Sequence, residues 1–188
     1  MSEVNIITGL SGVGKSTVLE EALKLADEEY KLINYGDRML QTAKDEGIVN
    51  SRDELKDLGA AKQKEVQKKA AKSIVADSEE SNVIVDTHAA IKTPQGYLPG
   101  LPRWTIENLD PEKIIMIDAS AEEIYSRSTS DTDRDREHNS PEEIAEYKEI
   151  AKKMAAAGSV LTGAYFQIIE NPDKGAEQAA EELIKALR

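Results

Sequence analysis

The most constraining feature of this 188-residue chain is a glycine-rich segment near its N-terminus. The segment Gly9-Leu10-Ser11-Gly12-Val13-Gly14-Lys15-Ser16 matches G-x-x-x-x-G-K-[ST] at every fixed position, and Thr17 follows it. Glycines let the backbone wrap around phosphates with its N–H groups turned inward, and a helix beginning at Lys15 directs its positive end at the same anion. Lys15 can reach the β- and γ-phosphates, and the Ser16 hydroxyl can hold Mg²⁺. Residues 9–17 are therefore predicted to bind the phosphates of a nucleotide.

The pattern of apolar runs predicts an α/β fold. Five short runs without strict alternation indicate strands buried on both faces: residues 4–7, 31–34, 82–86, 113–118 and 166–169. Helical stretches separate them, at residues 15–28, at 51–77 with a break near Gly59, after the capping box at Ser140-Pro141, and at 174–187. This alternation predicts one domain over residues 1–188, a three-layer fold with a five-stranded parallel sheet and helices on both faces.

Two segments interrupt the alternation of strands and helices. Residues 87–102 contain three prolines and two glycines, and they are predicted to be loop-like. Residues 128–139 are almost wholly polar and are predicted to connect two helices. Such excursions in open α/β sheets usually carry function.

Composition narrows the partners and the location. The chain has 24 Lys and Arg against 36 Asp and Glu, a net charge of −12, which disfavours nucleic acids and anionic membranes as partners. It has no cysteine, which excludes disulfides, zinc fingers and a thiol nucleophile and fits a cytoplasmic location. It has no signal-peptide pattern at its start and no apolar run of the roughly 20 residues that span a bilayer. Because nucleotide phosphates are anions, we expect the acidic residues to lie on outer helices and the binding cleft to be locally positive.

A phosphate loop occurs in GTPases, motors, transport ATPases and small-molecule kinases. The N-K-x-D guanine motif is absent, because residues 171–174 have its letters in the wrong order. There is also no second large region that could couple hydrolysis to mechanical work. The sequence therefore favours a kinase whose acceptor binds beside ATP.

Asp86 and His88 are candidates at the end of the third predicted strand. Asp86 falls at the carboxyl edge of the sheet, where ligands gather, and it could hold Mg²⁺ directly or through water, opposite Ser16. It could instead cap the turn that follows. His88 could bind a phosphate or form a hydrogen bond within the loop.

Arginines are few and grouped. Arg127, Arg134 and Arg136 fall in a polar segment without lysine, and planar guanidinium groups suit several phosphate oxygens at once. We interpret residues 127–140 as a short lid that closes over the transferring group and excludes water. The alternative is a solvated charge run, with aspartates between the arginines. Arg38 and Arg52 could meet an acceptor phosphate or be ordinary surface charges.

With these residues placed, the chain resembles the archaeal-type adenylate kinases, a branch of the P-loop nucleoside-monophosphate kinases. The resemblance spans essentially the whole chain. It rests on Gly9–Thr17, Asn34-Tyr35-Gly36, Ser51-Arg52-Asp53-Glu54-Leu55 followed by Leu58, Val85-Asp86-Thr87-His88, the string from Lys92 to Pro102, and Val160-Leu161-Thr162-Gly163-Ala164. The string from Lys92 to Pro102 is the most specific of these matches.

This resemblance implies the reaction ATP + AMP ⇌ 2 ADP with Mg²⁺, a helical AMP-binding region at about residues 35–78, and a homo-oligomer, commonly a trimer. It implies catalytic roles for Lys15, Arg127, Arg134 and Arg136, and it places the ATP adenine near residues 171–175. It directs a further set of residues toward AMP: Gly36, Arg38, Arg52, Asp86, His88 and Gly100. Lys152 stands where the resemblance leads us to expect an arginine.

Two alternatives remain open at this point. One keeps the kinase chemistry with another acceptor, such as CMP, UMP or a small hydroxyl compound. The other is a non-catalytic regulatory module that uses ATP as a switch. Phosphate itself is the nucleophile when AMP is the acceptor, so the lack of a Ser-His-Asp grouping is expected.

Overall fold

The structure is a computed structural model, and it describes residues 3–130 and 140–188. Arg134, Arg136 and most of the predicted lid at 127–140 lie outside the described residues. Within the described part of the chain, no helix combines the length and the apolar character needed to cross a membrane.

The first strand lies at the centre of a parallel sheet and leads straight into the glycine-rich segment. Five strands form this sheet in the order β2-β3-β1-β6-β7, and every neighbouring pair is parallel. They are β1 (Val4–Thr8), β2 (Tyr30–Asn34), β3 (Asn82–Asp86), β6 (Lys113–Asp118) and β7 (Tyr165–Glu170). The predicted α/β class and the five predicted strands are therefore confirmed, with bounds that differ by one residue at most.

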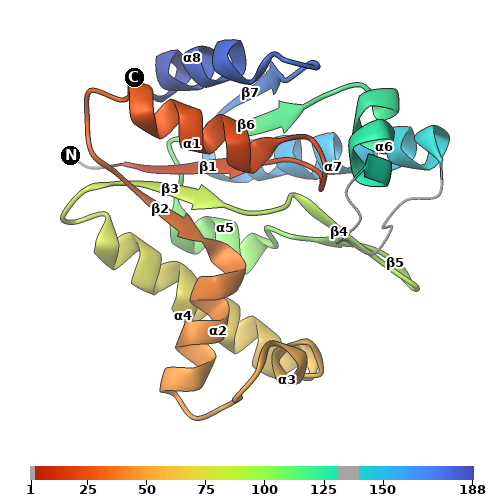
Figure 1. Ribbon diagram of the computed structural model, residues 1–188. Coiled ribbons are helices and arrows are strands. Elements are labelled where there is room, and N and C mark those ends of the chain that lie inside the picture. The colour runs from red at the N-terminus through yellow and green to blue at the C-terminus, as the bar shows by residue number, and fades with distance from the viewer. Residues whose placement is uncertain (1–2, 131–139) are drawn as a thin grey trace.

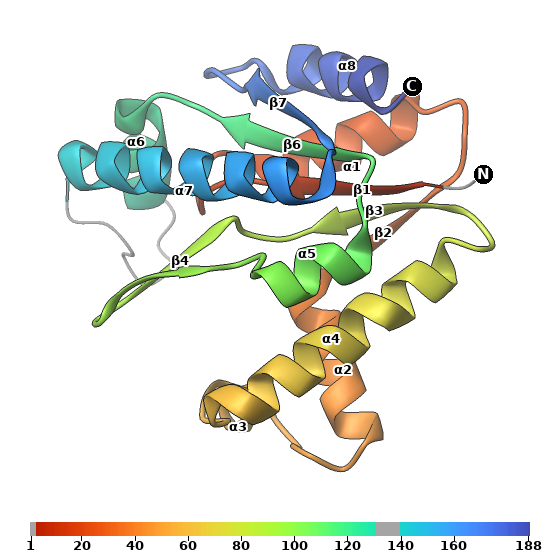
Figure 2. The ribbon, with the colours of Figure 1, turned by 180° about the vertical axis from the view of Figure 1, so that it is seen from behind.

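Helices cover both faces of the sheet, which gives the three predicted layers. Helices α1 (Lys15–Leu25) and α8 (Ala176–Leu187) lie together on the face seen in front in Figure 1. Helices α5 (Arg103–Leu109) and α7 (Pro141–Thr162) lie on the opposite face, in front in Figure 2. α6 (Ala121–Ser130) packs against α7. The first helix ends three residues earlier than the sequence predicted.

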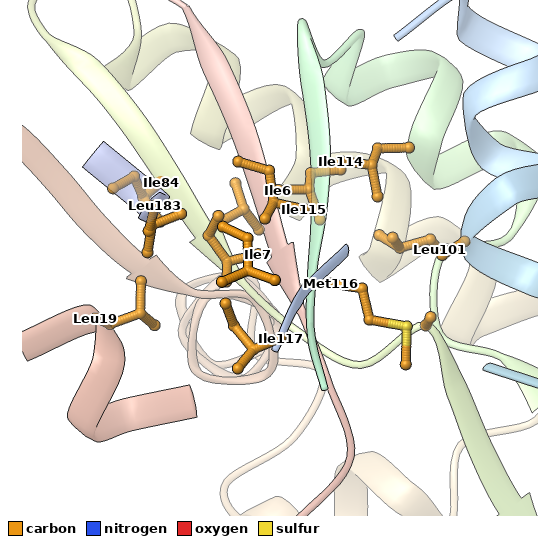
Figure 3. Close-up of a cluster of buried hydrophobic side chains, with 14 of the residues drawn as sticks. Ile6, Ile7, Leu19, Ile84, Leu101, Ile114, Ile115, Met116, Ile117 and Leu183 are labelled. Atoms are coloured by element: carbon orange, nitrogen blue, oxygen red, sulfur yellow. The ribbon is translucent and has the colours of Figure 1, made fainter. Parts of the chain in front are cut away.

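The main hydrophobic core lies between the sheet and these helices. Strands β1, β3 and β6 are almost wholly buried, because a parallel sheet covered on both faces exposes neither set of side chains to water. Figure 3 shows side chains from the central strands meeting residues from α1 and α8. Those labelled in the figure include Ile6, Ile7, Ile84, Ile114, Ile115, Met116, Ile117, Leu19 and Leu183.

Three helices form a separate projection below the sheet in Figure 1: α2 (Tyr35–Asp45), α3 (Arg52–Lys56) and α4 (Ala60–Asp77). The predicted break near Gly59 is confirmed, since Gly59 is the N-cap of α4. Side-chain caps start the other two helices: Asn34 accepts a hydrogen bond from the Asp37 N–H, and Ser51 accepts one from the Glu54 N–H. The projection has its own small buried cluster, made by Ala43, Val49, Leu55 and Val66.

Residues 87–102 were predicted to be loop-like, and that prediction is wrong for residues 90–99. They form a two-stranded antiparallel ribbon, β4 (Ala90–Thr93) and β5 (Gly96–Pro99), which projects from the sheet edge in Figures 1 and 2. The strands are joined by the two-residue turn at 94–95, and Gly96 takes a positive φ of 124°. Proline and glycine, which usually mark loops, here make the tight turn of a ribbon.

Candidate active site

The glycine-rich segment forms the connection between β1 and α1 at the carboxyl edge of the sheet. Gly12 and Gly14 have φ angles of 87° and 84°, a backbone conformation that favours glycine. Gly14 is also the N-cap of α1, so the positive end of that helix faces the loop. A Cβ added at Gly14 would lie 2.5 Å from the Asn171 Nδ2, so glycine is required there for space as well.

Lys15 and Asp86 meet directly in front of this loop. The Lys15 ammonium forms an ion pair with Asp86 Oδ1, and Asp86 Oδ2 accepts a hydrogen bond from Asn34 Nδ2 at 3.2 Å. Burial lowers the pKa of Lys15 to about 8, in spite of the neighbouring carboxylate. Ser16, the next residue, is exposed in the first turn of α1. The predicted carboxylate at the end of the third strand therefore lies beside the predicted phosphate-binding lysine.

The helical projection contacts the Lys15–Asp86 pair through Asn34, and Gly36 and Arg52 lie near Asn34. Asn34 caps α2 with its Oδ1 and holds Asp86 with its Nδ2. The Arg52 guanidinium crosses from α3 and forms an ion pair with Asp37. Its Nη1 lies 3.7 Å from the position that a Cβ of Gly36 would take. Gly36 and Arg52, both predicted to face the acceptor, therefore lie close together, and Gly36 is beside the Asn34 side chain that binds Asp86.

Arg38 is not part of this group. Its Nη2 binds Asp77 Oδ2 at 2.5 Å and its Nη1 donates to Ser73 Oγ at 3.1 Å, both on α4. Asp77 also pairs with Lys31 of β2 at 3.0 Å. In this arrangement the donors of Arg38 join α2 to α4 and do not point to the Lys15–Asp86 pair.

His88 and Gly100 shape the backbone next to the loop. The His88 Nδ1 donates to the Gly9 carbonyl at 2.9 Å, because a carbonyl can only accept. The Gly100 N–H donates to the Ala89 carbonyl at 2.9 Å, and a Cβ at Gly100 would collide with the His88 carbonyl oxygen. These contacts explain the two residue types by packing, and they connect the β4–β5 ribbon to the phosphate loop.

Arg127 supports the phosphate loop from behind. It lies on α6 and donates to the Val13 carbonyl at 3.2 Å and to the Asn171 carbonyl at 3.0 Å. It also pairs with Asp173 at 2.8 Å. Asn171 Nδ2 donates to the same Val13 carbonyl at 2.7 Å. The described contacts of Arg127 are therefore to the loop and to the segment after β7, and its role in a lid stays a prediction.

Two carboxylates lie beside Arg127: sequence reasoning offered Glu123 as its i,i+4 partner and missed Asp173. Glu123 accepts hydrogen bonds from the Ser120 hydroxyl and backbone N–H and from the Asp173 N–H, and these bonds lower its pKa to about 2. The i,i+4 spacing of Glu123 and Arg127 was the one available signal, and their closest atoms are 4.0 Å apart. Asp173 comes from the other end of the chain, so no local pattern could have found it.

A second missed group lies at the end of β6. Asp118 is 1% exposed, and its carboxylate contacts Lys148 at 3.1 Å and Lys152 at 2.9 Å, one helical turn apart on α7. The Asp118 Oδ1 also accepts from the Ala119 N–H at 2.9 Å. Lys152, the residue that departs from the expected arginine, is therefore engaged with a buried carboxylate.

The fold and the loop define the class: this is a P-loop protein that binds nucleotide phosphates. A family model described as an AAA domain matches residues 8–145. The adenylate kinase of Methanopyrus kandleri is 45% identical over 100% of this chain and 99% of its own length. Those of Methanothermobacter thermautotrophicus and Pyrococcus furiosus are each 43% identical, over 98% and 100% of this chain and 99% and 96% of their own. The chain belongs to the adenylate kinase family.

Solved structures agree on the fold at much lower identity. Shikimate kinase from Bacteroides thetaiotaomicron superposes with a TM-score of 0.60 at 14% identity, covering 98% of each chain. Shikimate kinase from Acinetobacter baumannii, in complex with shikimate, gives 0.62 at 13% identity over 100% of this chain and 93% of that one. At this identity the likeness concerns the fold alone.

Proposed function

We propose that this protein transfers the γ-phosphoryl group of ATP to AMP, reversibly, giving two ADP. Membership of the adenylate kinase family supports the activity. The observation that carries the acceptor side is the meeting of two regions at Asp86, which binds Lys15 of the phosphate loop and Asn34 at the start of the helical projection. Both substrates belong to the cytoplasmic nucleotide pool, so we also propose a cytoplasmic location.

The residues at this meeting point suit transfer between two phosphates. The AMP phosphate is already an anion, so the protein needs no general base to activate it. Catalysis then consists of holding two nucleotides in line and neutralising the charge between them, to which the Lys15 ammonium and the N-terminus of α1 contribute. Arg134 and Arg136, outside the described residues, stay proposed as lid arginines.

The oxygen donors beside Lys15 fit Mg²⁺. The ion prefers hard oxygen ligands and keeps several waters when it binds nucleotide phosphates, so few protein ligands suffice. Ser16 offers an exposed hydroxyl, and Asp86 offers a carboxylate whose two oxygens already accept from Lys15 and Asn34. We therefore propose Ser16 as a direct ligand and Asp86 as a ligand through water. When bound, the ion would supply positive charge that offsets the negative charge of the ATP phosphates.

Arg52 and Gly36 are the proposed acceptor contacts. An acceptor screen tests this: AMP, CMP and UMP are each offered with ATP, and ADP formation is followed. We expect the highest kcat/KM with AMP, and a higher value with CMP would contradict the proposal. Arg52→Ala should raise KM for AMP by about tenfold to a hundredfold and leave KM for ATP within about twofold. Lys56→Ala, an exposed change on the same helix, is the matched control.

A regulatory ATP-binding module is the competing function. It predicts tight ATP binding with no AMP-dependent appearance of ADP. Measuring ADP formation with and without AMP, alongside ATP binding by calorimetry, separates the two. Turnover that requires AMP excludes the module, and binding without turnover excludes the kinase.

We also propose that the protein forms a homo-oligomer, as a trimer by resemblance. Four exposed apolar side chains support this: Val160 is 85% exposed, Tyr165 73%, Leu161 51% and Ile168 37%, at the end of α7 and on the edge strand β7. Light scattering should give a mass of three times 20.7 kDa. Tyr165→Lys should reduce the mass to one chain, whereas the control Leu32→Lys on the opposite edge strand should not. A monomeric wild type would contradict the proposal.

A further inference from the structure

The cluster at the end of β6 combines features that a simple packing contact does not need. Asp118 has a nearly inaccessible carboxylate, and it contacts two ammonium groups from one helix. The side chains of Lys148 and Lys152 are 13% and 28% exposed, so both cations are largely withdrawn from water. Lys148 additionally donates to the Ala119 carbonyl. Two like charges four residues apart on a helix repel each other, and the shared carboxylate holds them together.

The cluster adjoins the phosphate loop through short contacts. The Asp118 carbonyl accepts a hydrogen bond from the Asn171 N–H at 2.7 Å, and the Asn171 side chain binds the Val13 carbonyl of the loop at 2.7 Å. On the other side, a Cβ at Gly9 would lie 2.7 Å from the Ile117 carbonyl, the residue before Asp118. β6 is also the immediate neighbour of β1 in the sheet, so both strands end at the same edge. Figure 2 shows α7 running along this face.

The charges around the cluster indicate that its two ammonium groups can attract an anion in addition to Asp118. One buried carboxylate is shared by two largely buried lysines, so the positive charges outnumber the negative ones among the buried groups. Two further carboxylates act on Lys152: Glu149, whose Oε1 is 3.9 Å from Lys152 Nζ, and Glu170 at the end of β7. Both are exposed, so water screens them. The ion pair with Asp118 raises the pKa of Lys152, so this lysine stays charged at neutral pH.

We propose that Asp118 is a positioning residue for phosphoryl transfer, whose buried carboxylate holds Lys148 and Lys152 so that their ammonium groups add positive charge beside the phosphate loop. This inference rests on the proposed function. It differs from a purely structural role, in which the three residues would only attach α7 to the sheet. In variants that stay folded, the positioning role predicts a lower kcat and the structural role predicts an unchanged kcat.

Four single variants test the proposal. Asp118→Asn keeps an oxygen that can accept from the Ala119 N–H, removes the charge and replaces the other acceptor oxygen with an NH2 group. Lys148→Met and Lys152→Met remove one ammonium each and keep most of the apolar stem. Lys153→Met, at an exposed position on the same helix, is the matched control. For each variant, kcat and the KM values for ATP and AMP are measured in ADP formation, with the Tm measured alongside.

We expect Lys152→Met, Lys148→Met and Asp118→Asn each to lower kcat by about tenfold or more relative to Lys153→Met, because charges near the transferring group are lost or displaced. Lys152→Arg should recover most of the kcat lost in Lys152→Met. Adding Lys148→Met to Asp118→Asn should raise the Tm again, because the repulsion between lysines is gone, and should not restore kcat.

A structural role gives a different result. The Lys→Met variants would then keep the kcat and KM of the control while only the Tm changes, and the double variant would restore kcat together with the Tm. Either finding overturns the proposal, and the lysine variants decide the matter if Asp118→Asn does not fold. A wild type that makes no ADP from ATP and AMP would overturn the proposed function and this inference with it. If the wild type is active and the variants keep its kcat and KM values, the inference alone is overturned.

Discussion

The sheet region and the helical projection differ in how many large apolar side chains they bury. Under the sheet, Ile6, Ile114, Met116 and Ile117 are 0% exposed and belong to one continuous cluster that includes α1, α7 and α8. In the projection of α2, α3 and α4, the separate cluster contains four buried residues, and only one of them, Leu55, is larger than valine. The phosphate loop stands on the first region, and the proposed acceptor contacts stand on the second.

The difference indicates that the donor side is rigid and that the acceptor side can move. Local opening costs least where few apolar contacts are made. The projection is joined to the sheet region mainly through α4 and α5, where the buried Tyr35 hydroxyl donates to the Gln67 carbonyl at 3.0 Å and lies 3.2 Å from Thr105 Oγ1. Trp104 Nε1 donates to Gln67 Oε1 at 2.7 Å in the same contact. This contact is where the projection is attached to the sheet region, so we take it as the pivot of any movement of the projection.

The largest expected effect concerns the donor side. Lys15→Met should lower kcat by about a thousandfold or more, because the ammonium that neutralises the transferring phosphate is removed. The fold should persist, since Met keeps the buried stem and no longer brings a desolvated charge. Steady-state kinetics with a circular dichroism melt checks this. A variant with kcat within tenfold of the wild type would break the assignment of Lys15 to the donor side.

The second prediction compares the two cores directly. Ile115→Ala, under the sheet, should cost about 3–5 kcal/mol of unfolding free energy. Val66→Ala, in the projection, should cost about 2 kcal/mol and raise KM for AMP without changing KM for ATP. Denaturant unfolding gives the free energies, and ADP formation gives the KM values. Equal effects of Val66→Ala on both KM values would show that the two regions are not independent.

The third prediction uses the pKa of Lys15. Its ordinary value is 10.5, and burial lowers it to about 8 in the folded protein. Between these two pH values the unfolded chain binds more protons, so this residue makes the free energy of unfolding rise with pH. Activity should change in the opposite direction, because kcat/KM for ATP falls as Lys15 loses its proton above about pH 8. A flat profile of kcat/KM between pH 7 and pH 10, measured at fixed free Mg²⁺ concentration, would contradict the assignment.

The smallest expected effect is a change in fluorescence, which tests whether the projection moves at the contact between α4 and α5. Trp104 is the one tryptophan in the chain, and Lys64 Nζ of α4 lies 4.4 Å from its ring centroid. If AMP moves α4 relative to α5, the Trp104 fluorescence should change by about a tenth or more on AMP addition and less on ATP addition, since a neighbouring cation is displaced. Lys64→Met should weaken this response. Equal responses to the two nucleotides would place the motion elsewhere.

Local patterns predicted the elements well where one physical cause dominated. Continuous apolar runs gave all five parallel strands, and the Ser140 capping box gave the start of α7, where Ser140 Oγ accepts from the Glu143 N–H at 3.3 Å. The β4–β5 ribbon was missed because Pro94 and Gly96 serve a tight turn and a loop equally well. Nothing in the sequence near Arg38 and Arg52 distinguishes their roles. Arg38 forms an ion pair with Asp77 only because α2 packs on α4.

The sequence by itself determined the phosphate loop, the strand set and the place of Asp86, because these depend on neighbouring residues and on the rule that parallel strands end at a common edge. Only the tertiary structure decided which distant groups complete the site. Asn171 binds the Val13 carbonyl from 158 positions away, and Asp118 holds two lysines of α7. A buried polar group must find a partner, but the chain can supply that partner from any distance in sequence, and only the fold selects it.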